Sequence, residues 1–162
     1  MIDWLILTGA ALIFCFGFVV AFGAPYLPTL SPQVKTSLEL LNLKPGQTLL
    51  ELGCGGGNIL IAAAKQDLFV VGYELNPILA LVAWLRTRRY SGRVRVVWGN
   101  FWTKKWPPAD GIFVFGIDNY MKRLHKKITQ QFNKPVKLVS FAFKIPGKKQ
   151  TAQKDGLYLY QY

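Results

Sequence analysis

The stretch LLELGCGGGN, residues 49–58, decides the fold of this chain. Two leucines lead into an acidic residue, Glu51, and glycines then stand at Gly53, Gly55 and Gly57. A buried strand that ends in such a loop, with a helix after it, allows a ligand to lie against bare backbone. Glycine is needed there because a Cβ atom would block the ligand or forbid a positive φ. The stretch therefore predicts a strand, a loop and a helix that together hold a small ligand.

The spacing of the glycines indicates which ligand to expect. A dinucleotide fingerprint has its third glycine three residues after the second, but Asn58 and Leu60 stand at that distance after Gly55 and Gly57. Glu51, just before the loop, would repel a pyrophosphate and suits a ligand with a cationic end. S-adenosylmethionine (SAM) carries an ammonium and a sulfonium, so the segment favours SAM. A tight strand-to-helix turn without a ligand is the alternative.

An uncharged apolar stretch, residues 4–24, precedes this loop. As a helix with a rise of ~1.5 Å per residue it would reach about 31 Å, enough to cross the hydrocarbon core of a bilayer. A cleaved signal peptide fits less well, because no Lys or Arg precedes the run and Pro25 would follow the cut. A buried core helix is the other alternative. We expect a transmembrane helix in residues 1–24, a connecting segment with an amphipathic helix in 25–47, and the ligand-binding domain in 48–162.

Positive charge is concentrated after the apolar stretch. All 20 Lys and Arg residues follow residue 34, with seven of the eight acidic residues, so this part carries a net charge of +13. Positive charge beside a membrane span stays on the cytoplasmic side, or on the matrix side in an organelle. We therefore expect a single-pass protein with its domain on that side, and contact with anionic lipid headgroups rather than nucleic acid. The two cysteines, Cys15 and Cys54, lie in the span and in the loop, which predicts neither a disulfide nor a metal site.

Strand-like and helix-like patterns alternate along the rest of the chain. We expect helices at 32–42, 58–66, 77–89 and 119–131, and strands at 48–52, 69–74, 94–98, 111–116, 136–143 and 157–162. Such alternation predicts βαβ units in a Rossmann-like, doubly wound α/β fold with a mostly parallel sheet of about six strands. The last strand follows a long loop without a helix, so we expect it to return antiparallel beside the fifth.

Chemically useful side chains follow the second and third strands. Ligands of doubly wound sheets bind at the carboxyl ends of the strands. Glu74 ends the second strand, 21 residues beyond Gly53, near the ~20 expected for an acid that binds ribose hydroxyls. After the third strand, Asn100 can bond an adenine edge, and Phe101 or Trp102 can pack on its face. The alternatives are a surface carboxylate and a loop with two core aromatics.

These segments resemble a known family. They are PYLPTLSPQV, ELGCGGGNILIAAA, GYELNP, the GNFW turn and VSFAFKIPG, in that order along the chain. The chain is similar to class I (seven-β-strand) SAM-dependent methyltransferases. More narrowly, it resembles the membrane-anchored protein-lysine methyltransferases of the ATP synthase c-subunit and adenine nucleotide translocase type. It departs from the family at Gly56 and Asn58, where Asp and Arg are usual, at Asn100, where an acid is usual, in the sequence DNY after the fourth strand, and in a sheet one strand short.

The resemblance implies roles for individual residues. Four of them are expected to hold the methionine part of SAM: Glu51, Gly53, Gly55 and Gly57. Glu74 is expected to hold the ribose. The remaining expected cofactor contacts are Cys54, Leu75, Asn76, Asn100 and Phe101.

Methyl transfer to lysine requires a neutral amine. With a reference pKa of ~10.4, about one lysine in a thousand or fewer is neutral at pH 7, and burial in an apolar pocket lowers that pKa. The residues expected to line this pocket are Tyr26, Thr29, Trp102 and Phe115, together with Phe101 and Tyr120. Asp118 and Tyr120 are the catalytic candidates, since Asp118 could guide the incoming cation or accept a proton through water. A helix cap followed by a packing residue is their alternative.

The sequence therefore predicts methylation of a lysine in a membrane-associated protein. Methylation of RNA, of a lipid or of a small amine is the alternative within enzymes. Base methylation commonly uses an Asn/Asp-Pro-Pro-aromatic motif after the fourth strand, where this chain has GIDNY. A membrane scaffold that binds SAM without turnover is the alternative outside enzymes.

Overall fold

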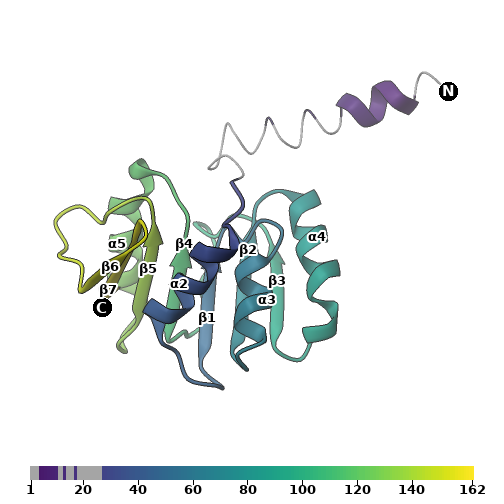
Figure 1. Cartoon of the computed structure of the whole chain (residues 1–162). Coiled ribbons are helices and arrows are strands. Elements are labelled where there is room, and N and C mark those ends of the chain that lie inside the picture. The colour runs from purple at the N-terminus through teal and green to yellow at the C-terminus, as the bar shows by residue number, and fades with distance from the viewer. Residues whose placement is uncertain (1–3, 11–12, 14–16, 18–26) are drawn as a thin grey trace.

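The computed structural model describes residues 4–10, 13, 17 and 27–162. Residues in this part form a seven-stranded sheet with the order β3-β2-β1-β4-β5-β7-β6 (Figure 1). The strands are β1 (Thr48–Leu52), β2 (Phe69–Glu74), β3 (Val94–Trp98), β4 (Gly111–Val114), β5 (Lys137–Phe141), β6 (Ala152–Lys154) and β7 (Leu157–Gln161). The first five run parallel, β7 runs antiparallel to β5, and β6 runs antiparallel to β7. The Rossmann-like prediction and the antiparallel return of the last strand are confirmed.

Helices cover both faces of the sheet. They are α2 (Ser31–Leu41), α3 (Asn58–Ala64), α4 (Pro77–Thr87) with the short 3-10 turn η1 (Arg88–Tyr90), and α5 (Asp118–Gln131). Alternate residues of β1 point to opposite faces: Leu49 packs in one core with α2 and α3, and Leu50 packs in the other with α5. Because both faces are covered, the sequence of β1 is mostly apolar and does not alternate between apolar and polar residues.

The seventh strand corrects the prediction of about six strands. Strands β6 and β7 form a hairpin whose two loop residues, Asp155 and Gly156, both have positive φ (51° and 77°). Two positive φ angles are the requirement of the hairpin turn whose twist matches the strands, and Asp-Gly is a preferred pair for it. The expected strandless loop was wrong because this three-residue strand is too short to show a period in the sequence.

The expected transmembrane helix is also wrong. A membrane span needs about 20 consecutive apolar residues in a helix. Residues 4–10, 13 and 17 are helical. Within the part of the chain that the structure describes, no helix is both long enough and apolar enough to cross a bilayer. Most of the predicted segment, residues 11–12, 14–16 and 18–24, lies outside the described residues.

Candidate active site

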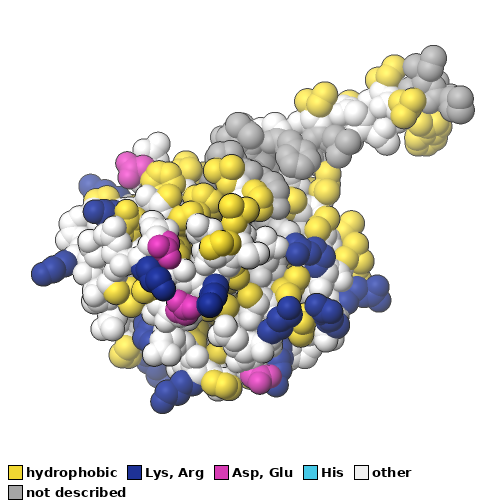
Figure 2. Space-filling model, in the orientation of Figure 1, with side chains coloured by type: hydrophobic (Ala, Val, Ile, Leu, Met, Phe, Trp, Pro, Cys, Tyr) yellow, Lys and Arg dark blue, Asp and Glu magenta, His cyan; other side chains and the backbone are white. Residues whose placement is uncertain are grey.

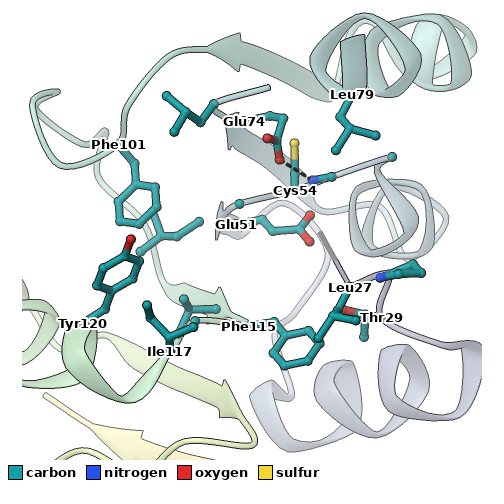
Figure 3. Close-up of a pocket in the computed structure, with 18 of the residues that line it drawn as sticks. Leu27, Thr29, Glu51, Cys54, Glu74, Leu79, Phe101, Phe115, Ile117 and Tyr120 are labelled. Atoms are coloured by element: carbon teal, nitrogen blue, oxygen red, sulfur yellow. Dashed lines mark hydrogen bonds between the residues drawn. The ribbon is translucent and has the colours of Figure 1, made fainter. Parts of the chain in front are cut away.

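A pocket opens at the carboxyl ends of the parallel strands. Its volume is about 400 Å³, and its walls come from residues 27–29, the glycine loop after β1, the end of β2, and the turns after β3, β4 and β5. Figure 3 shows Phe101 and Tyr120 on one side of this pocket, and Leu27 and Thr29 on the other. The pocket lies where a doubly wound sheet is expected to bind its ligand, and its size is that of a small-molecule site.

The glycine loop takes a conformation that side chains would strain. The φ angles of Gly53, Gly55 and Gly57 are 87°, 50° and 82°, a region that residues with a Cβ atom rarely adopt. The N–H groups of Gly53 and Cys54 both donate to the carbonyl of Tyr73 in β2, each at 2.9 Å. The loop is thus fixed against the neighbouring strand with its backbone bare toward the pocket.

Two buried carboxylates lie beside this loop. One oxygen of Glu74 accepts the N–H of Gly55 and the other accepts the N–H of Asn76, both at 2.8 Å. Glu51 projects into the pocket (Figure 3), and its Oε2 is buried without a hydrogen-bond partner in the described structure. Burial raises the pKa of Glu74, and burial followed by the charge of Glu74 raises the pKa of Glu51 well above its ordinary value. A cationic group in the pocket would stabilise the ionised form of either carboxylate.

An arginine from α4 supports the glycine loop from outside. Arg86 donates to the carbonyl of Gly56 and, at 3.0 Å, to Oδ1 of Asn58. The Nδ2 group of Asn58 donates to the carbonyl of Thr29 at 3.0 Å. The position where the resemblance expects an arginine holds Asn58, and the arginine that contacts the loop comes from α4. Asn58 also ties the loop to the segment that forms the opposite wall.

Aromatic rings form the wall next to the turn after β3. The rings of Phe101 and Trp102 are 4.6 Å apart between centroids, and Tyr120 from α5 meets Trp102 edge-on at 5.5 Å. On another side, Phe115 packs on Phe141 at 4.5 Å. Phe101, Trp102, Phe115 and Tyr120 all line the pocket, which gives it an apolar wall.

Lys127 of α5 holds this aromatic turn in place. Its Nζ donates to the carbonyls of Phe101, Trp102 and Lys104 at 3.1, 2.7 and 2.8 Å. Partial burial, and then the charge of Arg123, lower the pKa of Lys127, and Arg123 itself lies over the Trp102 ring at 4.4 Å. Three carbonyls gathered on one ammonium fix the backbone of the turn and so the direction of its rings.

The pocket contains most of the residues that the sequence predicted. Those that line it are Thr29, Glu51, Gly53, Cys54, Gly55, Glu74, Leu75, Asn100, Phe101, Trp102, Phe115 and Tyr120. Asn100 shapes its turn, because its Oδ1 accepts the N–H of Trp102 at 2.9 Å. Tyr26 lies outside the described residues. The roles assigned to all of these residues stay predictions.

Three predicted residues do not line the pocket. Gly57 turns the chain into α3 with its positive φ, and Asn76 caps α4 by accepting the N–H groups of Ile78 and Leu79. Asp118 is exposed in the first turn of α5, where Ile117 and not Asp118 occupies the cap position. The geometry therefore gives Asp118 neither a place in the pocket nor the helix-capping role that was its alternative.

Sequence reasoning missed several lining residues. They are Leu27, Pro28, Leu52, Gly56, Asn58, Leu79, Val114, Gly116, Ile117, Ala142 and Phe143. Gly116 and Ile117 follow β4, while Ala142 and Phe143 follow β5. Since the carboxyl ends of all parallel strands meet at one edge, the position after each predicted strand was the available signal. Residues 27 and 28 carry no such signal.

Comparisons with known proteins point to one family. The profile of the ANTKMT methyltransferase domain matches residues 51–152. The chain is 31% identical to the lysine N-methyltransferase of the ATP synthase c-subunit from Xenopus laevis over 124 residues, 75% of this chain and 54% of that protein. It is 32% identical to a protein-lysine N-methyltransferase of Saccharolobus islandicus over 128 residues, 76% of this chain and 79% of that protein. The chain thus spans about half the length of the Xenopus relative.

A solved structure shares the fold. The RNA methyltransferase of Salinibacter ruber, in complex with S-adenosyl-L-homocysteine, superposes with a TM-score of 0.76. The superposition covers 84% of this chain and 92% of that one, at 23% sequence identity. At this identity the likeness concerns the fold alone.

Proposed function

Because the chain belongs to the family of ANTKMT methyltransferase domains, we propose that it uses SAM to methylate lysine side chains of a protein. The relatives from Xenopus laevis and Saccharolobus islandicus support the choice of lysine, since both are named as lysine N-methyltransferases. A membrane-associated substrate and a location on the cytoplasmic side stay predictions.

The observation that carries the proposal is the unpartnered oxygen of Glu51 in the wall of the pocket. A buried carboxylate without a partner costs free energy unless a ligand supplies a cation or a donor. The ammonium of SAM is such a group. The oxygens of Glu74, each with one backbone partner, have lone pairs left to accept ribose hydroxyls. The residues present therefore fit SAM.

When bound, SAM supplies a methyl group on a positively charged sulfur, which is an electrophilic carbon. This chain's residues then have two tasks, to align the amine with that carbon and to keep water away from it. Phe101, Trp102 and Tyr120 perform both, because their rings form an apolar wall beside the glycine loop. An apolar wall also favours the neutral form of an incoming lysine, which is the form that attacks.

The test measures where the methyl group goes. The purified chain is incubated with SAM labelled in the methyl group and with protein, RNA and lipid fractions of its own cell. Label recovered as methyl-lysine after hydrolysis of the protein fraction supports the proposal. Label only in RNA or only in lipid overturns the choice of lysine. SAM binding in a calorimeter with no transfer to any fraction supports the non-catalytic scaffold, and no SAM binding refutes both.

A pair of tryptophan variants locates the substrate wall. Trp102→Ala is expected to lower kcat/KM for the protein substrate about tenfold or more, since it removes a ring that touches Phe101 and Tyr120. SAM affinity should change little. Trp98→Ala is the matched control, because Trp98 is exposed at the end of β3 and does not line the pocket. Equal losses in the two variants would place the substrate elsewhere.

A further inference from the structure

Helix α4 has its large apolar side chains on the outside. Its buried residues are Ala80, Ala83 and Thr87, which are small and follow one another at helical spacing. Its large side chains point outward: Leu81 is 54% exposed, Val82 37%, Trp84 51% and Leu85 49%. A helix that only covers a sheet normally turns its large apolar residues inward. These four residues define the outer face of α4. This face exposes large apolar side chains that packing on the sheet does not require.

The small inner residues have their own reason. A Cβ atom on Gly57 would lie 3.4 Å from the Cβ of Ala83, so α4 passes close to the glycine loop. Small side chains allow that approach. The small inner residues do not explain the large apolar side chains on the outer face. A helix that faces only water would carry polar side chains there.

An excess of positive charge borders the outer face, although Arg93 pairs with Asp67. Residues 75–109 contain seven basic residues and no acidic ones. Arg88 and Arg89 follow directly on α4, and neither forms an ion pair within the part of the chain that the structure describes. The guanidinium of Arg88 lies 5.3 Å from the centre of the Trp84 ring, and that of Arg89 lies 5.0 Å from the centre of the Tyr90 ring. Figure 2 shows hydrophobic side chains with Lys and Arg beside them on the side where Figure 1 places α4.

We propose that the outer face of α4, with Arg88 and Arg89 at its end, is a docking surface for an anionic lipid bilayer. Aliphatic residues and tryptophan on one face, with arginine beside them, are what a helix lying in the membrane interface presents. The helix would lie along the bilayer surface with its outer face among the headgroups. A second copy of this chain would bring the same positive charge against itself. Nucleic acid would gain nothing from Leu81, Val82 and Leu85.

Docking on α4 would set the position of the pocket. Leu79 of the same helix lines the pocket, so a bilayer that contacts the outer face would lie close to the site. Lysines of proteins held at that bilayer would then be within reach, a consequence that rests on the proposed function. The docking itself does not depend on it.

An environment-sensitive fluorophore on the outer face tests the proposal directly. The full chain carries Cys15→Ser and Leu81→Cys, with an NBD group on the new thiol. Cys54 is buried but lines the pocket, so the same chain without Leu81→Cys measures any labelling there. The probe is expected to shift to the blue and brighten with vesicles of equal parts phosphatidylglycerol and phosphatidylcholine, and to stay unchanged with phosphatidylcholine alone. The matched control is Phe69→Cys, an exposed apolar position at the start of β2, where no change is expected.

A charge-reversed variant tests the arginines. Arg88→Glu together with Arg89→Glu should weaken binding of the Leu81→Cys probe to the anionic vesicles at least about tenfold, since each surface arginine contributes about fivefold. The proposal is overturned if the probe at position 81 does not respond, or if positions 69 and 81 respond alike. It is also overturned if, without vesicles, the probe at position 81 shifts to the blue when the protein concentration is raised or when RNA is added. The first result would indicate a second copy of the chain as the partner, and the second would indicate nucleic acid. The assay contains neither SAM nor substrate, so its result does not depend on whether the proposed function is correct.

Discussion

Replacing Glu51 by Gln should stabilise the protein without ligand and weaken its binding of SAM. The side chain is 3% exposed, and its Oε2 has no hydrogen-bond partner in the described structure. Burial, and then the charge of Glu74, raise the pKa of Glu51 well above 4.5, so ionisation of Glu51 in the folded chain costs free energy. Glutamine keeps the shape and removes the charge.

Both effects have an expected size. A buried polar group without a partner costs roughly 1–3 kcal/mol. Because the amide of Gln also stays unpaired, we expect a gain of about 1 kcal/mol in the free energy of unfolding. For a chain of this length that is a rise of about 2–4 °C in Tm. A hydrogen bond to a charged group contributes roughly 1.5–3 kcal/mol, so the Kd for SAM should rise about 10- to 150-fold.

The stability gain should depend on pH in a defined direction. Between 4.5 and the raised pKa of Glu51, the folded chain binds more protons than the unfolded chain. The stability of the parent therefore falls as the pH rises through that window, while Glu51→Gln lacks this loss. The difference in stability should be smallest below pH 4.5 and largest once the pH exceeds the raised pKa of Glu51. The SAM affinity of the parent should rise over the same window as Glu51 ionises.

Thermal unfolding without ligand and calorimetric titration with SAM measure the two quantities. Glu39→Gln is the matched control, because Glu39 is exposed on α2 and pairs only with surface lysines among the described residues. It should change neither quantity appreciably. Loss of stability in Glu51→Gln, or unchanged SAM affinity, would refute the reasoning that Glu51 waits for the cationic end of SAM.

Three further predictions concern the support of the pocket. Lys127→Met should destabilise the fold by about 1 kcal/mol and raise KM for the protein substrate, since three carbonyls lose their donor. Chemical denaturation measures the first effect and steady-state kinetics the second. The control variant Lys126→Met, at an exposed position, should show neither. Gly72→Ala places a Cβ 2.9 Å from Cys54 and should cost about 1–3 kcal/mol and weaken SAM binding. Gly92→Ala, with open space around its Cβ position, should change neither the stability nor the SAM affinity. Thermal unfolding and calorimetric titration with SAM measure both variants. Asp118→Asn should leave kcat/KM within about twofold, because Asp118 does not line the pocket; a tenfold loss would restore it as a catalytic candidate.

Local patterns in the sequence predicted much of the fold. The bounds of β1, β2 and β3 agree with the expected ranges 48–52, 69–74 and 94–98. These strands are runs of apolar residues that end at glycine, Asn or Pro signals, and such signals act within a few residues of chain. The span predicted in residues 4–24 shows the limit of this reasoning. The stretch is uncharged, yet no helix in the described part of the chain is long and apolar enough to cross a bilayer.

The sequence alone predicts the glycine loop, the two acids and the strand ends at which they meet, because these depend on spacing along the chain. The support of that loop depends instead on packing between distant segments. Arg86 reaches Asn58 across 28 residues, and Lys127 reaches the turn after β3 across 23 to 26 residues. The same packing leaves one oxygen of Glu51 without a partner among the described residues and turns the large side chains of α4 outward. These contacts arise when distant segments pack, so no local period in the sequence could specify them.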